Sequence, residues 1–160
     1  MRVCEEALKA KFSTVEELFA YLSNISADEK LKSHLARYMV MVVYAAFESG
    51  IKDAFYAHID RTVQNLQIAD HLKSSIKKNY RNVDFAQLLY LIDMFDACKD
   101  NLETRYKDTE ITDSFNNIVT NRQSIAHGGL CTVTFSEIES YYNKAKPLLL
   151  DLANTLDSRQ

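Results

Sequence analysis

Arg122 and His127 are the two residues of this sequence whose types and spacing best suit proton transfer on an anionic substrate. Histidine can exchange a proton near neutral pH. Arginine keeps its charge and binds carboxylates or phosphates through a planar set of donors. We therefore take Arg122 and His127 as candidate catalytic residues, with Asn121 and Gln123 as supporting polar groups.

Arg122 is predicted to lie on the apolar face of a helix. This helix is expected from about Asp113 to Gly128-Gly129, since paired glycines favour a helix stop. At about 100° per residue, Arg122 falls in the middle of the apolar stripe, so its guanidinium must face the core or a partner surface. His127 lies about 140° further round the helix, on a different face. It occupies the last turn, where the helix dipole favours a protonated imidazole.

Glu48 is the acidic residue best placed in the sequence to supply a carboxylate acceptor for the Arg122 guanidinium. It interrupts an apolar side of a long predicted helix, and an unpaired carboxylate there is costly to desolvate. We therefore predict that Glu48 and Arg122 come near one another, with Tyr44 lining the same site. Two purely structural interpretations stay open: a buried Arg122–Glu48 salt bridge, and His127 as a C-terminal capping residue.

The elements that position these residues are expected to be helices, because the sequence has only three glycines and one proline. Ser26-Ala27-Asp28-Glu29 resembles a capping box at the start of the second helix. A short strand-like piece is expected at 130–135. The pattern predicts one all-α domain over 1–160, an antiparallel bundle of five to six helices. The expected helices cover 3–23, 26–63, 68–80, 83–102, 113–127 and a last segment from Ser136.

The second predicted helix carries apolar residues on two sides. Such a helix is either central in its bundle or shared between the core and a partner. One stripe includes Leu35, Tyr38 and Met39, and the other includes Met41 and Tyr44 among others.

The net charge of the sequence limits how the protein could bind nucleic acid. The net charge of −3 argues against a domain that binds long nucleic acid mainly through phosphate neutralisation. A nucleic-acid role must then be local, transient or built at an oligomer interface. The basic run Lys73, Lys77, Lys78 and Arg81 is best interpreted as a solvated helix face, with RNA guidance as a less favoured role.

Cysteine, histidine and apolar patterns predict a cytoplasmic protein without a metal site or a membrane span. Cys4, Cys98 and Cys131 form no paired or zinc-type pattern, and isolated thiols suit a reducing compartment. His34, His58 and His71 lack metal-ligand spacing and are expected at the surface or on a helix flank. No signal peptide is evident, and the most apolar run, 38–47, is about half the length of a bilayer span.

The segment from Phe115 to Gly128, F-N-N-I-V-T-N-R-Q-S-I-A-H-G, resembles the signature of HEPN domains, an arginine and a histidine separated by four residues. The resemblance is nearest to the branch that groups the RiboL-PSP and MAE_28990-like domains. Glu48 within A-A-F-E-S also resembles that branch. The similarity extends over about residues 30 to 155.

The resemblance implies a metal-independent ribonuclease without a cofactor, usually a homodimer, in which the ribose 2′-hydroxyl attacks the adjacent phosphate. It implies that His127 handles the proton and Arg122 holds the scissile phosphate, at a composite site shared by two copies. Gln123 stands where the family often has Asn, Asp or His, which puts activity in question. Gly129 stands where some toxins carry a modified tyrosine, so that arrangement is not supported.

Three interpretations follow. The first is an RNA-cleaving toxin or defence component, with an antitoxin or other partner protein. The second is a catalytically inactive HEPN module for dimerisation or partner binding. An unrelated helical adaptor is the third.

Overall fold

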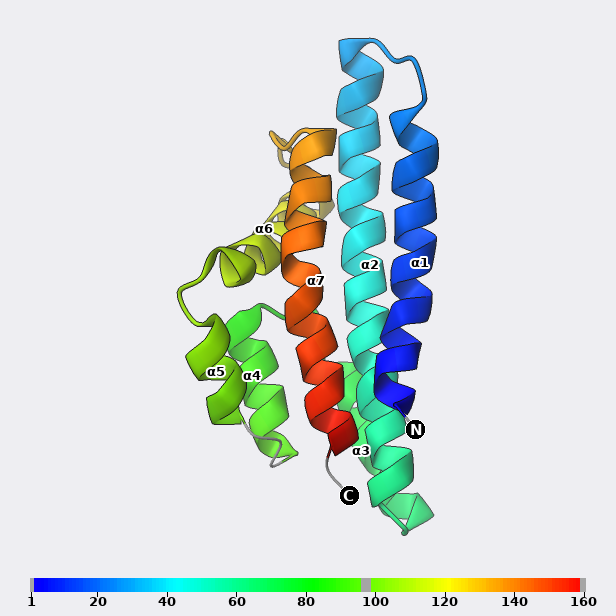
Figure 1. Cartoon of the computed structure of the whole chain (residues 1–160), viewed down its shortest axis with the longest axis vertical. Coiled ribbons are helices and arrows are strands. Elements are labelled where there is room, and N and C mark those ends of the chain that lie inside the picture. Colours follow the sequence, from blue (N-terminus) through cyan, green and yellow to red (C-terminus); the bar gives the residue numbers. More distant parts are fainter. Residues whose placement is uncertain (1, 96–98, 159–160) are drawn as a thin grey trace.

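The protein is an all-helical bundle, as the sequence predicted (Figure 1). The computed structural model describes residues 2–95 and 99–158. These residues contain seven α-helices and no strand, so the predicted strand-like piece at 130–135 is wrong. The helices are α1 (Val3–Ser23), α2 (Glu29–Thr62), α3 (Leu66–Asn79), α4 (Phe85–Met94), α5 (Lys99–Tyr106), α6 (Glu110–Ala126) and α7 (Phe135–Ser158).

The predicted helix at 83–102 is instead divided into α4 and α5, which raises the helix count above the expected five to six. α4 ends at Met94 with Phe95 as its C-cap, and α5 begins at Lys99. α4 packs against α6, whereas α5 packs against α7. Ile92 of α4 and Leu102 of α5 are both buried in the core.

α2 is the central helix and contacts α1, α3, α6 and α7. Its N-cap is Asp28, whose side chain accepts a hydrogen bond from the Leu31 N–H at 2.8 Å. The predicted N-cap at Ser26 is therefore wrong by two residues. Aspartate is itself a favoured N-cap residue, and the helix begins after Asp28. Tyr38 and Met41 on the two predicted stripes remain 52% and 37% exposed, so α2 presents more apolar surface than this core covers.

An aromatic cluster holds α1, α2, α6 and α7 together. Phe47 of α2 stacks on Phe115 of α6 and on Tyr142 of α7, with ring centroids 6.0 and 5.9 Å apart. Phe12 of α1 meets both Phe47 and Tyr142 edge to face. All four rings are buried, and burial of such a side chain contributes roughly 1.5–3 kcal/mol. This cluster fixes α6 against α2.

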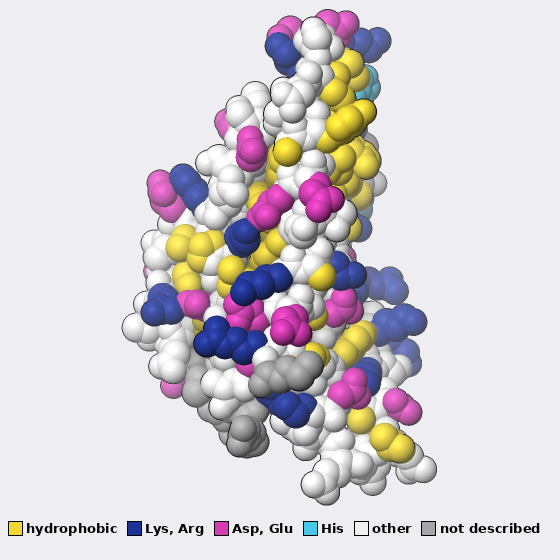
Figure 2. Space-filling view, turned by 45° about the vertical axis from the view of Figure 1, so that its right-hand side comes forward, with side chains coloured by type: hydrophobic (Ala, Val, Ile, Leu, Met, Phe, Trp, Pro, Cys, Tyr) yellow, Lys and Arg dark blue, Asp and Glu magenta, His cyan; other side chains and the backbone are white. Residues whose placement is uncertain are grey.

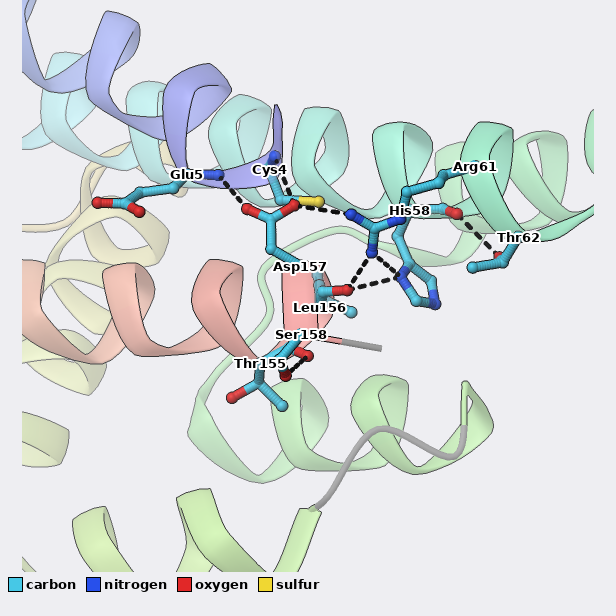
Figure 3. Close-up of polar contacts among 9 residues, drawn as sticks. All are labelled: Cys4, Glu5, His58, Arg61, Thr62, Thr155, Leu156, Asp157 and Ser158. Atoms are coloured by element: carbon cyan, nitrogen blue, oxygen red, sulfur yellow. Dashed lines mark hydrogen bonds and ion pairs between the residues drawn. The ribbon is translucent and has the colours of Figure 1, made fainter. Parts of the chain in front are cut away.

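Asp157 joins the two ends of the chain (Figure 3). Its carboxylate accepts hydrogen bonds from the backbone N–H groups of Cys4 and Glu5, at 3.2 and 3.1 Å, in the first turn of α1. Arg61, near the end of α2, forms an ion pair with the same carboxylate at 3.0 Å. A carboxylate at a helix N-terminus satisfies free N–H groups and the helix dipole, so Asp157 connects α1, α2 and α7.

His58 is a buried residue, and its predicted surface position is wrong. It is 5% exposed, and its Nδ1 lies 3.0 Å from the Leu156 carbonyl oxygen. His58 lies on the face of α2 that meets the end of α7. The sequence alone does not show that these two segments meet. His34 and His71 are exposed, as predicted.

The thiols of Cys4 and Cys131 are free, as expected. Burial, followed by the hydrogen bond with Asp157, raises the pKa of Cys4 to about 12, so this thiol stays protonated. Cys98 lies outside the described residues. Among the helices of the described chain, none is long and apolar enough to cross a membrane.

Asp157→Asn is expected to lower the free energy of unfolding by about 1–2 kcal/mol at pH 7, because the carboxylate loses its charge-assisted hydrogen bonds. Burial acts to raise the pKa of Asp157, but the hydrogen bonds from Cys4, Glu5 and Arg61 hold it below its usual value near 3.8. The stabilisation is therefore present above that value and is lost as pH falls through the lowered pKa.

Urea denaturation of wild type and Asp157→Asn, between pH 7 and pH 3, measures this effect. The stability gap should shrink in the acid range. Asp70→Asn, at an exposed position on α3, serves as the control and should stay within about 0.5 kcal/mol of wild type. A gap that is constant with pH would contradict the role of the Asp157 charge.

Candidate functional site

Arg122 projects from the buried face of α6 toward α2 and the α3–α4 connection. Phe115, Ile118 and Val119 on the preceding turns are buried, so the helix directs Arg122 to the same side. Its Nη1 donates a hydrogen bond to the Asn82 side-chain oxygen at 2.6 Å. Its guanidinium carbon lies 4.9 Å from the centroid of the Tyr44 ring. A neutral amide and an aromatic face thus take the place of the expected carboxylate.

Asn82 is the residue of the site that sequence reasoning missed. It lies in the α3–α4 connection with φ +56°, a left-handed conformation that asparagine tolerates better than most residues. Its backbone N–H donates to the Tyr44 hydroxyl oxygen at 2.8 Å. The Asn82 side chain meanwhile accepts from Arg122. A turn at Arg81-Asn82 can be read from the sequence, but its meeting with a residue forty positions later cannot.

Tyr44 interacts with both Arg122 and Glu48. Burial, then a hydrogen bond with Glu48, raises the pKa of Tyr44 to about 12, while the Asn82 N–H and the charge of Arg122 oppose the rise. The hydroxyl is therefore neutral at physiological pH. Tyr44 thus works as a hydrogen-bonding and stacking group that orients its neighbours.

Within the described residues Glu48 does not form a salt bridge with Arg122, the structural interpretation left open by the sequence. Its ion pair is with Lys52, one turn later on α2, and both side chains are largely buried. Lys52 lies four residues after Glu48 on the same helix, a spacing that brings the two side chains together. Glu48 and Arg122 are brought to the same tyrosine, Tyr44, but each has a different ionic or polar partner.

A cavity of about 10 Å³ lies beside this cluster, between Tyr44, Glu48 and Tyr80. That volume corresponds to about one water molecule. Two buried polar atoms of the cluster, the Tyr80 hydroxyl and Nε of Arg122, have no hydrogen-bond partner within the described residues. Arg122 as a whole is only partly buried, so its charge remains within reach of the surface.

His127 is the C-cap residue of α6 and is exposed. The chain then closes a Schellman motif, in which the N–H of Gly128 bonds to the Ile125 carbonyl and that of Gly129 to the Ser124 carbonyl, at 3.1 and 2.8 Å. Gly128 has φ +74°. A Cβ on Gly129 would lie 2.9 Å from the Ser124 carbonyl oxygen. The two glycines therefore fix where His127 stands.

The supporting residues Asn121 and Gln123 are both partly buried on α6. The Asn121 amide donates to the Asn117 carbonyl at 2.8 Å, and its oxygen lies 4.0 Å from the Cys131 sulfur. Gln123 accepts the His127 N–H through its backbone carbonyl at 3.1 Å. Both residues therefore have local roles on the helix, and within the described part of the chain neither forms a hydrogen bond with the Arg122 side chain.

One chain presents Arg122 and His127 on different faces of α6. Five residues correspond to about 7.5 Å along the helix axis and about 140° of rotation. Arg122 is oriented by α2 and Asn82, whereas His127 stands in solvent at the end of the helix. Among the described residues, no group of three His, Cys, Asp or Glu side chains is placed to bind a metal ion.

Gly128→Ala is expected to lower the free energy of unfolding by about 1 kcal/mol, because a Cβ is strained at positive φ. Gly128→Asn should lose less, since asparagine adopts this conformation more readily. Chemical denaturation of the three proteins measures the order. Equal stability of wild type and Gly128→Ala would show that the helix end does not need this backbone geometry.

Comparison with known proteins identifies the family of the chain. No curated protein and no solved structure matched the chain. A family model described as RiboL-PSP-HEPN matches residues 6–158, which include every helix that positions the site. HEPN domains are all-helical, commonly bind RNA and dimerise, and are often ribonucleases. The chain belongs to the RiboL-PSP-HEPN family.

Proposed function

We propose that this protein is a metal-independent endoribonuclease whose catalytic residues are Arg122 and His127. The observation that carries the proposal is their placement at the end of α6. Arg122 is oriented by Asn82 and Tyr44, and His127 is exposed on the C-cap that two glycines define. An oriented guanidinium and a solvent-reachable imidazole are the groups that phosphodiester cleavage needs.

The chemistry is a transesterification within the RNA strand. The ribose 2′-oxygen attacks the adjacent phosphorus, and the bond from phosphorus to the 5′-oxygen breaks. The products are a 2′,3′-cyclic phosphate and a 5′-hydroxyl end. His127 exchanges the proton of the attacking or leaving oxygen. Arg122 binds the phosphate and stabilises the negative charge that develops on it.

A homodimer would complete the site, since Arg122 and His127 of one chain do not share a face. Hydrophobic side chains gather along one edge of the upper half of the molecule, below its charged tip (Figure 2). On the first half of α2, Leu31, Tyr38 and Met41 are 42%, 52% and 37% exposed. Contiguous exposed apolar residues favour a protein interface. Two copies would also concentrate positive charge in one cleft, which suits an anionic substrate despite the acidic net charge.

As the physiological role we propose a toxin or a defence component against invading nucleic acid. A ribonuclease that acts on cellular RNA needs restraint, so an antitoxin or another partner protein fits this role. The proposal places the protein in the cytoplasm, where its RNA substrate is found.

One observation favours a second function, a catalytically inactive HEPN module for dimerisation or partner binding. The Arg122 guanidinium already donates a hydrogen bond to Asn82 and stacks on the Tyr44 ring, and its Nε is buried. Gln123 also replaces the shorter polar residue that often follows the family arginine. In this case Arg122 stabilises the contact of α6 with α2 and takes no part in chemistry.

His127→Ala is expected to reduce RNA cleavage at least 100-fold, because a proton-transferring side chain contributes that order of rate. The assay uses single-stranded RNA with a metal chelator present, and mass spectrometry identifies 2′,3′-cyclic phosphate ends. His71→Ala, which removes another exposed histidine, should cleave like wild type. Equal activity in His127→Ala, or none in wild type, would contradict the nuclease; a wild-type dimer without cleavage favours the inactive module.

Tyr38→Glu is expected to shift a homodimer to monomers, because it places a charge in the exposed apolar face of α2. Light scattering after size exclusion, at several concentrations, measures the mass against 18.4 kDa for one chain. Tyr90→Glu on α4, where the tyrosine is 68% exposed, is the control and should leave the mass unchanged. A wild type that is monomeric at every concentration would refute the dimer.

A further inference from the structure

A groove runs between α3 and α4 and has no role in the chemistry described above. We call it the α3–α4 groove; it has a volume of about 330 Å³. Its floor is apolar and includes Leu72, Ile76, Leu91 and Phe95. Ser75, Asn79 and Gln87 add hydroxyl and amide groups along the walls. A mainly apolar hollow with a few polar groups is the usual composition of a ligand site.

Positive charge lies in and next to the α3–α4 groove. Arg81 lines it, whereas Lys77 and Lys78 adjoin its residues in the sequence and do not line it. Among the described residues, no aspartate or glutamate lines the groove. Lys77 and Lys78, in the last turn of α3, are exposed together with Arg81. In the described part of the chain, none of these three cations has an ion-pair partner, whereas Lys73 earlier on α3 pairs with Asp60. These free cations suit a polyanion rather than a neutral ligand.

Two acidic residues directly adjoin groove residues in the sequence, Asp84 after Val83 and Asp93 before Met94. Asp93 is exposed on α4 and is not without a partner. The side chain of Asp84 caps α4 by accepting the Gln87 N–H at 2.9 Å. Its charge thus faces the first turn of α4, where the helix dipole partly compensates it. The cations of α3 are therefore not neutralised by Asp84.

Tyr90 gives the groove an aromatic surface. It lines the groove and is 68% exposed, with Met94, 57% exposed, one turn further along α4. Exposed aromatic rings bind unpaired bases by stacking, and neighbouring cations bind the backbone phosphates. An acidic peptide would use the cations but has no equivalent need of a stacking ring. The combination therefore favours single-stranded nucleic acid.

The α3–α4 groove is continuous with the candidate active site through three consecutive residues. Tyr80 and Arg81 line the groove, and Asn82 holds the Arg122 guanidinium. Tyr80 also borders the small cavity beside Tyr44 and Glu48. A strand lying in the groove would therefore run toward the phosphate-binding arginine.

We propose that the α3–α4 groove is a subsite for single-stranded RNA, in which Tyr90 stacks on an unpaired base and Lys77, Lys78 and Arg81 bind flanking phosphates. The assignment of RNA as the ligand rests on the proposed ribonuclease function. The groove binds nucleotides next to the scissile bond and so directs cleavage to unpaired RNA.

The test measures binding separately from cleavage. A fluorescein-labelled 12-nucleotide RNA with 2′-O-methyl riboses lacks the attacking hydroxyl and cannot be cut. Its anisotropy is followed with the full-length wild type, Tyr90→Ala and the double variant Lys77→Gln/Lys78→Gln. Matched controls are Tyr21→Ala, since Tyr21 is 69% exposed on α1, and Lys107→Gln/Lys144→Gln, which removes two charges elsewhere.

Tyr90→Ala is expected to weaken binding about tenfold, the effect of one lost stacking contact. The lysine double variant should reduce the slope of log affinity against log salt by about 1.4, which corresponds to two single-strand phosphate contacts. Both controls should match wild type. Circular dichroism confirms that each variant remains folded.

Unchanged RNA affinity in both test variants would overturn the groove assignment, as would absence of RNA binding by wild type. A labelled peptide of alternating Glu and Phe is the competing probe: loss of its binding alone in the test variants would assign the groove to an acidic polypeptide and refute RNA. The two proposals fail separately. Groove-dependent RNA binding without cleavage refutes only the nuclease, and cleavage with unaltered binding in the variants refutes only the groove.

Discussion

The permanent charge of Arg122 on the apolar face of α6 is the constraint around which this site is built. An arginine side chain stays protonated when it is partly buried, so the fold must supply hydrogen-bond acceptors for its guanidinium. Asn82 supplies a carbonyl oxygen, and Tyr44 supplies an aromatic face. Because the acceptors come from the α3–α4 connection and from α2, one guanidinium ties three parts of the chain together. The same contacts give the side chain the fixed orientation that phosphate binding requires.

α2 serves both the core and the candidate site. Phe47 joins the aromatic cluster with Phe115 and Tyr142, and Tyr44, one turn earlier, reaches Asn82. Displacement of α2 would thus disturb packing and site together. The surface that α2 leaves uncovered, which includes Tyr38 and Met41, lies on the half of the helix that precedes the site.

The far end of the bundle is stabilised by a different device. Asp157 caps α1 and pairs with Arg61, while His58 is buried against the Leu156 carbonyl (Figure 3). These contacts place charge and hydrogen bonds where three helix ends meet and leave backbone groups unsatisfied.

The sequence by itself determined the helical class, the end of α6 at Gly128-Gly129 and the place of Arg122 on an apolar face, because periodicity and helix stops are local properties. It also pointed to Tyr44 and Glu48. Only the tertiary structure decided that Asn82 holds Arg122, that Glu48 pairs with Lys52, that His58 is buried and that α4 and α5 are separate. Those outcomes depend on which distant segments meet, and a charged side chain takes whichever acceptor the packing brings within reach.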